Sequence, residues 1–307
     1  IINKEIPHES KNFTKTKNNN QVIKDTYVKN SQPYISVDVW ISIADLVIDS
    51  KYKNCVHNYN YSKELDAVFK TKKNPIILVK TDLLPDYINI LLSISNPFIL
   101  LTTSNDDHCP PYLKYPSNES EYPNLKINTD KLLNSNNLIK WYAKNPCIIH
   151  PKLKPYPIGP KWQWKTTKFF GENKLEHMKI YNLFGKNAEL SFKNKNLKKN
   201  LLYLNFNQTT NNPLFFLHKN SRHNAKSQLI KNGFKWNDNK SFKDYIEFLS
   251  SYKFALAPPG RGIDTHRCWE ALMVGTIPIV LSSSINNLYK NLPVIIVQTW
   301  SVITKEF

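Results

Sequence analysis

Two of the three arginines in this chain, Arg261 and Arg267, lie in one short stretch that also holds three of its seven glycines. The stretch runs from Phe254 to Leu281 and reads FALAPPGRGIDTHRCWEALMVGTIPIVL. Elsewhere lysine is the usual cation, since 39 of the 42 basic residues are lysines. An arginine retained against that background indicates a need for a planar, forked and permanently charged group, and such a group suits phosphate.

The pattern of this stretch predicts a strand, a Pro-Pro-Gly-Arg-Gly loop and a helix. Ligands of open α/β sheets bind beyond the carboxyl ends of the strands, and a helix N-terminus there attracts phosphate. We expect Gly260 and Gly262 to let the backbone approach a phosphate closely. Arg261 or Arg267 would add forked hydrogen bonds, and Asp264 and Thr265 are good residues to cap the helix.

Three charged residues of the predicted helix are spaced three apart. Asp264, Arg267 and Glu270 should therefore share one face, while Trp269 and Met273 meet the core. A carboxylate one to two turns below a phosphate-binding loop suits the hydroxyl pair of a ribose. The alternative is that Arg267 and Glu270 form an ordinary i,i+3 ion pair on a solvated face.

The same stretch resembles the nucleotide-sugar-binding motif of the exostosin-like glycosyltransferases, glycosyltransferase family 47 and its relatives. The segments LYKNLPVIIVQTWSVIT and IKWYAKNPCIIHPKLKPYPIG also resemble parts of that family. The resemblance implies a GT-B fold, an α/β architecture of two facing Rossmann-like domains with a cleft between them. It further implies a donor site in the C-terminal domain, an acceptor site mostly in the N-terminal domain and no obligatory metal. The chain departs from the family by its short N-terminal half and by ending just after Trp300.

Matched position by position, the family motif implies which residues bind the donor. Gly260, Arg261 and Gly262 match the phosphate loop, Arg267 matches the motif arginine, and Glu270 matches the acidic residue that holds ribose or sugar hydroxyls. Arg222 begins a predicted helix after a strand and loop, and we expect it to contact phosphate as well. The complete predicted donor set is Arg222, Pro259, Gly260, Arg261, Gly262, Asp264, His266, Arg267 and Glu270.

A candidate catalytic base lies in the segment TTSNDDHCP, which follows a predicted strand at 98–102. An inverting transfer needs a carboxylate or histidine to deprotonate the acceptor hydroxyl, and Asp106, Asp107 and His108 are the candidates. The alternative is a solvated turn whose polar side chains bond their own backbone. His150 and His266 are the next candidates.

The apolar pattern predicts two α/β halves. We expect an extended or poorly ordered arm over 1–30, an acceptor-side domain over 31–160, a connection over 161–195 and a nucleotide-sugar-binding domain over 196–307. In the first half the pattern predicts strands at 34–40, 76–79, 98–102 and 147–150 and helices at 85–93 and 138–143. In the second half it predicts strands at 201–207, 253–258, 276–281 and 293–298 and helices at 221–233, 241–252, 264–275 and 284–291.

Composition limits the partners. The net charge of +18 suggests an anionic partner, although an excess of lysine and asparagine is also what an AT-rich genome encodes. Four cysteines and eight histidines show no metal-ligand spacing, so we expect no metal. No apolar run approaches the roughly 20 residues of a membrane span. The chain starts at Ile1 rather than methionine, which leaves a signal or anchor upstream of it open.

The resemblance to the exostosin-like family implies a metal-independent, inverting glycosyltransferase, and the pattern of the phosphate loop agrees with it. Its donor is a nucleoside-diphosphate sugar, expected to be a UDP-sugar, and its acceptor is a hydroxyl of a glycan or glycoprotein. One alternative is a nucleic-acid-associated protein that binds DNA or glycosylates a base, but no helix-turn-helix, zinc-finger or RNP-like motif supports it. The other is an inactive glycosyltransferase-fold scaffold. The chain as given is expected to be soluble, in the cytoplasm or encoded by a virus, or in the secretory pathway if an anchor precedes it.

Overall fold

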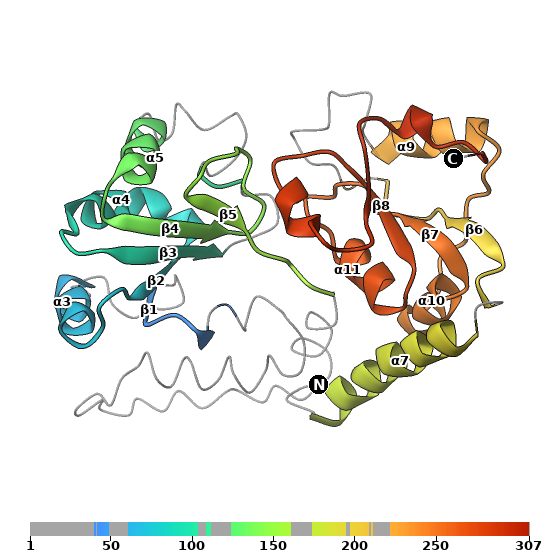
Figure 1. Ribbon diagram of the computed structural model, residues 1–307, viewed down its shortest axis with the longest axis horizontal. Helices are drawn as coiled ribbons and strands as arrows, with labels where there is room; N and C mark the ends of the chain where they lie inside the picture. Colours follow the sequence, from blue (N-terminus) through green and yellow to red (C-terminus); the bar gives the residue numbers. More distant parts are fainter. Residues whose placement is uncertain are drawn as a thin grey trace, which may run out of the picture.

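The computed structural model describes residues 40, 42–48, 61–103, 109–111, 124–160, 174–194, 197–208, 210 and 222–306. These residues form two parallel sheets, of five and of four strands, with helices packed against them (Figure 1). The predicted α/β class is confirmed, and the arrangement is compatible with a Rossmann-like fold.

The first sheet has its strands in sequential order, and every pair is parallel. Both faces are covered: Ile77 and Val79 belong to the larger core cluster, whereas Leu78 packs on the opposite side with Tyr156. An uninterrupted apolar run is typical of a parallel strand buried on both faces. The strands are β1 (Leu46–Ile48), β2 (Ile76–Lys80), β3 (Phe98–Thr103), β4 (Leu138–Ala143) and β5 (Leu153–Pro155).

Three helices cover the larger core cluster of this sheet. They are α3 (Tyr61–Thr71), α4 (Leu84–Ser93) and α5 (Leu125–Asn134), and η2 (Thr81–Leu83) leads into α4. The predicted strand–helix–strand unit over 76–102 is therefore confirmed. Pro85 stands in the first turn of α4, where its missing N–H leaves no helical hydrogen bond unmade.

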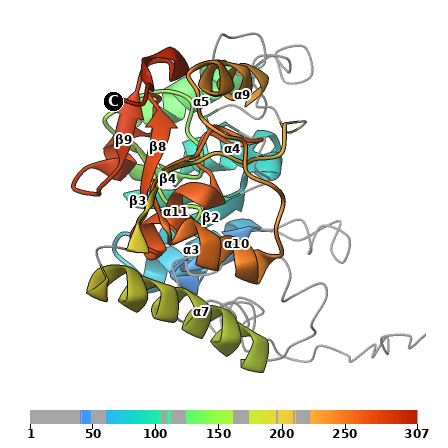
Figure 2. The same cartoon turned by 90° about the vertical axis from the view of Figure 1, so that its right-hand side faces the viewer.

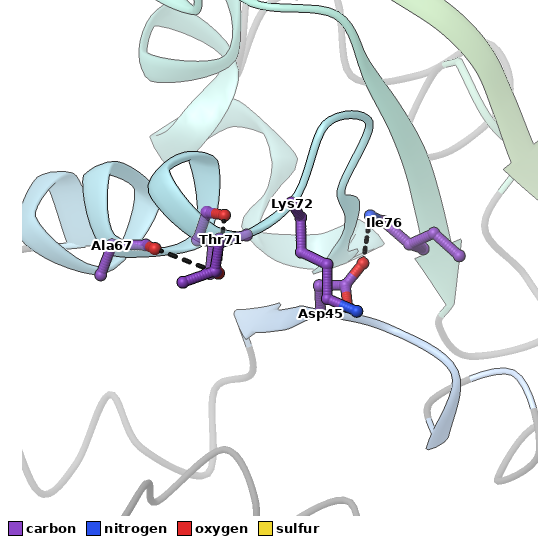
Figure 3. Close-up of polar contacts among 6 residues, drawn as sticks. Asp45, Ala67, Thr71, Lys72 and Ile76 are labelled. Carbon is purple, nitrogen blue, oxygen red and sulfur yellow. Dashed lines mark hydrogen bonds and ion pairs between the residues drawn. The ribbon is translucent and has the colours of Figure 1, made fainter.

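A carboxylate fixes the turn between α3 and β2 (Figure 3). Asp45 accepts a hydrogen bond of 2.9 Å from the backbone N–H of Ile76, and its other oxygen lies 3.6 Å from the Lys72 ammonium. The hydroxyl of Thr71 donates to carbonyl oxygens of the last turn of α3. These contacts hold the end of α3 beside β1.

The second sheet also has its strands in sequential order and all parallel. One of its faces packs on α9 and η5, and the other packs on α7, α10 and α11, with α7 lying along the outer side (Figure 2). Its strands are β6 (Asn200–Tyr203), β7 (Tyr252–Leu256), β8 (Ile277–Leu281) and β9 (Ile295–Val297). Its helices are α7 (Lys174–Lys193), α9 (Arg222–Lys231), α10 (Phe242–Leu249), α11 (His266–Met273), η4 (Asn286–Tyr289) and η5 (Trp300–Val302).

Three predicted helix ends of the second half are confirmed, although the helix predicted at 241–252 ends at Leu249 and Tyr252 begins β7. Ser241 accepts a hydrogen bond from the backbone N–H of Asp244 and caps α10. Gly233 and Gly275 follow α9 and α11 with φ of 84° and 71°, a conformation that favours glycine at a helix C-terminus.

Two predictions for the first half are wrong. Residues 138–143, predicted as a helix, form β4, and residues 147–150, predicted as a strand, lie outside the strands of the described chain. The register between β3 and β4 shifts at Phe98, where the pairing passes from Leu138 to Lys140. This bulge lets Leu138 and Trp141, three residues apart, enter the same core, so a strand acquires the spacing of a helix.

The two sheets divide the described chain near the predicted boundary. The first ends at Pro155 and the second begins at Asn200. Helix α7 falls within the predicted connection but packs against α10 and α11, so it belongs structurally with the second sheet. Among the described residues, none of the helices has the length and apolar character needed to cross a membrane. The predicted arm over 1–30 and nearly all of the predicted strand at 34–40 lie outside the described residues.

Candidate functional site

The predicted phosphate loop joins β7 to α11 at the carboxyl end of the second sheet. The backbone N–H of Gly260 donates to the carbonyl oxygen of Gly262 at 2.9 Å, so this donor is used inside the loop. Both glycines have φ outside the left-handed region, and Arg261 between them is exposed at the tip. Glycine is therefore needed here for a reason other than backbone conformation.

Arg222 supplies that reason. From the start of α9 its Nε donates to the carbonyl oxygen of Pro259 at 2.8 Å, and its Nη2 donates to that of Pro258 at 3.3 Å. Its Nη1 donates to the carbonyl oxygen of Asn207 at 2.8 Å. A Cβ atom added at Gly260 would lie 2.7 Å from Nη2 of Arg222. The missing side chain at Gly260 makes room for the guanidinium group.

Arg222 thereby joins two loops. Asn207 lies in the loop after β6, and Pro258 and Pro259 lie in the loop after β7. These strands are neighbours in a parallel sheet, so their carboxyl ends meet at one edge. A guanidinium carries five N–H bonds, and Arg222 uses three of them on these carbonyl oxygens.

Arg267 reaches the same edge from α11. Its guanidinium donates through Nη1 to the carbonyl oxygen of Asn205, which also lies after β6. Its carbon Cζ lies 5.0 Å from the ring centre of Tyr245 and 5.4 Å from that of Tyr203. Two aromatic rings thus fix the orientation of the charged group and stabilise it through cation–π contacts.

The two arginines affect each other electrostatically. Burial, and after it the positive charge of Arg267, lower the pKa of Arg222 to about 10. The hydrogen-bond partners described above are backbone carbonyl oxygens, which carry partial rather than full negative charge. An anion bound between the two guanidinium groups would relieve their repulsion, so this edge of the sheet is suited to a diphosphate.

Glu270 does not lie on a solvated face of α11. Its side chain is 4% exposed, and Oε2 accepts a hydrogen bond of 2.8 Å from the hydroxyl of Tyr245. The alternative of a solvent-exposed ion pair with Arg267 is therefore wrong. Instead, the negative charge of Glu270 favours the charged form of Arg267. Tyr245 contacts both residues, since its hydroxyl donates to Glu270 and its ring lies against Arg267. In this arrangement the carboxylate supports the arginine, and its predicted contact with ribose stays a prediction.

Asp264 was predicted to bind the donor, but its carboxylate is engaged in hydrogen bonds at the junction of the two sheets. It is 3% exposed, and its carboxylate accepts hydrogen bonds of 2.9 Å from the backbone N–H of Ile158 and from Nε1 of Trp269. The hydroxyl of Tyr289 adds a third donor at 3.3 Å. Its own N–H donates to Oδ1 of Asn145, in the loop after β4, at 2.8 Å. Burial raises the pKa of Asp264 to about 6.

Other contacts hold the same junction, where the chain leaving β5 approaches the second sheet (Figure 1). Nδ1 of His266 lies 2.7 Å from the carbonyl oxygen of Gly159, so this nitrogen carries the proton that is shared with it. The hydroxyl of Ser284 donates to the carbonyl oxygen of Pro146. Of the two predicted cap residues, Thr265 is the N-cap of α11, and its side chain makes no capping hydrogen bond. Asp264 and His266 therefore position the loop between the two halves of the chain.

The predicted catalytic residues are separate from this arrangement. Asp106, Asp107 and His108 lie outside the described residues. His150 lies in the first half, where its Nδ1 accepts a hydrogen bond of 3.2 Å from the backbone N–H of Lys152. In the described part of the chain, no group of three or more His, Cys, Asp and Glu side chains is arranged to hold a metal ion.

A pocket of about 400 Å³ between α3 and α4 contains none of the predicted site residues. It is lined by side chains such as Leu65, Phe69 and Ile90 and lies in the first half of the chain. The convergence of charged groups, rather than this hollow, identifies the candidate site.

Sequence reasoning missed the aromatic part of the site. The sequence places Tyr245 only within the helix predicted at 241–252 and Tyr203 only within the strand predicted at 201–207. A tyrosine on a core-facing position needs a partner for its hydroxyl, and this requirement is a usable signal. Nothing in the sequence pairs Tyr245 with Glu270, because the two are 25 positions apart and meet only when α10 and α11 pack side by side.

Comparisons with known proteins do not assign the chain to a family. No model of a known protein family matches the chain, and no curated protein matches it.

Proposed function

We propose that this chain is a GT-B-type glycosyltransferase that transfers a sugar from a nucleoside-diphosphate sugar, with UDP as the expected nucleotide. The acceptor is a hydroxyl group of a glycan or glycoprotein. The proposal rests on one observation above all, the pair of guanidinium groups of Arg222 and Arg267 at the carboxyl edge of a parallel sheet. The motif resemblance around these residues adds the substrate class.

The arginine pair suits the chemistry of the leaving group. Transfer of the sugar breaks the bond to the diphosphate, so negative charge grows on the diphosphate oxygens in the transition state. Preoriented cations at that position lower the barrier, because they need no reorganisation as the charge develops. Arg267 is held against two rings and Arg222 is held by three carbonyl oxygens, so both are preoriented.

The proposed mechanism assigns the remaining groups as follows. Tyr245 and Glu270 keep Arg267 in place, and Gly260 leaves space for Arg222. Asp264 and His266 set the loop against the first half of the chain, which would carry the acceptor and the base. The base itself, Asp106, Asp107 or His108, is proposed from the sequence alone.

Thermal unfolding with added ligand tests the proposal. UDP, GDP, dTDP and their sugars are each added in the presence of EDTA, with uridine and UMP as matched ligands that lack the diphosphate. A diphosphate at about 100 times its dissociation constant should stabilise the fold by roughly 2.7 kcal/mol, while uridine should not. No shift with any nucleoside diphosphate, with or without Mn²⁺, would refute the donor assignment.

A further inference from the structure

Two cysteines from separate loops meet at the carboxyl edge of the first sheet. Cys109 follows β3 and is 4% exposed, and Cys147 follows β4 and is half-buried. Strands β3 and β4 are parallel neighbours, so the loops that follow them emerge side by side. The meeting is therefore a consequence of the sheet order and not of proximity in the sequence, where the two cysteines are 38 positions apart.

Hydrogen bonds hold the segments of the two cysteines together. The backbone N–H of Cys147 donates to the carbonyl oxygen of Pro110 at 2.9 Å, which fixes one backbone beside the other. The Cys147 thiol donates to the carbonyl oxygen of Cys109 at 3.0 Å and lies 3.6 Å from that of Pro110. A disulfide requires adjacent backbones, and the contact of the Cys147 sulfur with the backbone of Cys109 shows that these two backbones are adjacent.

We propose that Cys109 and Cys147 form a disulfide that links the loop after β3 to the loop after β4. The inference does not depend on the glycosyltransferase assignment. Because disulfides persist in oxidising environments, it also implies that the chain functions in, or passes through, such an environment.

The chemistry proceeds by thiol–disulfide exchange, with a small disulfide such as oxidised glutathione as the oxidant. Cys147, the more accessible thiol, loses its proton and attacks one sulfur of glutathione disulfide. That S–S bond breaks, and one glutathione leaves as a thiolate that takes up a proton. Cys109 then loses its proton and attacks the sulfur of Cys147, which releases the second glutathione. In total, two cysteine thiols are oxidised and one glutathione disulfide is reduced to two glutathiones.

The order of attack follows from the environments of the two thiols. The hydrogen bond to Cys147, together with burial, raises the pKa of Cys109 well above its usual value. The thiolate is the attacking species, so the first attack by Cys109 is disfavoured. Cys147 is therefore the entry point, and Cys109 resolves the mixed disulfide.

Oxidation of the purified full chain tests this directly. After treatment with oxidised glutathione, the chain is unfolded, its free thiols are labelled with a maleimide mass tag, and its peptides are mapped. We expect a cross-linked pair of peptides that contain Cys109 and Cys147, absent after reduction with dithiothreitol. Cys109→Ser should retain glutathione on Cys147, whereas Cys147→Ser should leave Cys109 unmodified. Cys268→Ala, a change at a buried cysteine of α11, should leave the cross-link in place.

Thermal unfolding of the unsubstituted chain provides a second readout that does not depend on the folding of any variant. The oxidised chain should melt about 5 °C or more above the reduced chain, because a cross-link over a loop of this length restricts the unfolded state. Tagging of both thiols after oxidation, or a cross-link from either cysteine to Cys55, would overturn the proposal.

Discussion

Arg222 and Arg267 reach the same edge of the second sheet from two different helices and carry like charges within range of each other. Burial and the charge of Arg267 lower the pKa of Arg222 to about 10. Each donates to a backbone carbonyl oxygen of the loop after β6, and Arg222 also bonds to the loop after β7. The hydrogen bonds explain how the loops are tied together, but they leave two positive charges close to each other. Glu270 balances part of this charge at Arg267, and we propose that a bound diphosphate balances the rest.

Arg267→Lys should weaken the binding of UDP by roughly 1.5–3 kcal/mol, the range for a hydrogen bond to a charged group. Lysine keeps the charge but loses the fork and the flat face that lies against Tyr203 and Tyr245. Isothermal titration with UDP measures the change. Lys226→Gln, which removes a positive charge from α9 outside the arginine pair, should leave the affinity nearly unchanged. Equal affinities for Arg267→Lys and the unsubstituted chain, with the fold intact, would mean that the diphosphate binds elsewhere.

Gly260→Ala should weaken UDP binding about tenfold or more and should also lower the stability of the fold. The new Cβ would lie 2.7 Å from Nη2 of Arg222, so the guanidinium must shift and give up bonds to the loop after β7. The φ of Gly260 suits alanine, and the atom in the way belongs to a flexible side chain. Titration with UDP and thermal unfolding measure the two effects.

The matched control for this substitution is Gly185→Ala in the middle of α7. A Cβ at Gly185 meets nothing within 4 Å, and alanine favours a helix interior by roughly 1 kcal/mol over glycine. This variant should be more stable and should bind UDP normally. If Gly260→Ala also binds UDP normally, the position of Arg222 is not important for the donor.

Asp107→Asn or Asp106→Asn should reduce turnover by roughly 100-fold or more while leaving donor affinity unchanged. A catalytic base acts on the acceptor hydroxyl, and its loss does not affect the diphosphate contacts of the second half. Transfer rates at saturating donor, together with UDP titration, separate the two effects. Normal turnover in both variants would direct attention to His108 and then to His150 and His266.

The sequence was sufficient for the fold wherever a local pattern has one explanation. The apolar run at 76–79, Pro85 at a helix start and glycines after α9 and α11 each predicted an element that the structure contains. The prediction of a helix at 138–143 was wrong, because a bulge between β3 and β4 gives this strand the spacing of a helix. That bulge is a property of the pair of strands, so it cannot be read from one of them.

In the candidate site, too, the sequence indicated some residues, whereas contacts between distant elements could not be read from it. The scarcity of arginine drew attention to all three arginines, and the structure brings Arg222 and Arg267 to one edge of the sheet while Arg261 is exposed at the loop tip. Their predicted contact with phosphate stays a prediction. The sequence could not show that Gly260 makes room for Arg222, because this depends on how α9 sits over the loop. Nor could it show that Asp264 is a junction residue, since its partners Asn145 and Ile158 are more than 100 positions away.

Tyr245→Phe should lower the free energy of unfolding by roughly 1–3 kcal/mol, because it leaves the buried Glu270 carboxylate without one of its donors. Glu270→Gln should cost less in the Tyr245→Phe background than alone, since the two side chains interact directly. Urea unfolding of the two single variants and the double variant gives the coupling. Tyr252→Phe, which removes a hydroxyl bonded to Asn237 and not to Glu270, is the control, and it should show no coupling to Glu270→Gln.

The stability of the chain should carry a pH dependence from Asp264. Its pKa is raised by burial to about 6 in the folded chain, against about 3.9 when unfolded. A raised carboxyl pKa contributes stability that is fully present below pH 4 and is lost as the pH rises through 6. A difference of about two in pKa corresponds to roughly 3 kcal/mol.

Asp264→Asn removes this titration and points an amide N–H toward the donors of Ile158 or Trp269, so the variant should be less stable than the unsubstituted chain. The gap between them should widen as the pH falls from 7 to 4, as measured by urea unfolding across that range. Asp66→Asn, at an exposed carboxylate of α3, controls for the loss of one negative charge, and its gap should stay nearly constant. A gap for Asp264→Asn that is independent of pH would mean that the carboxylate does not titrate at the junction.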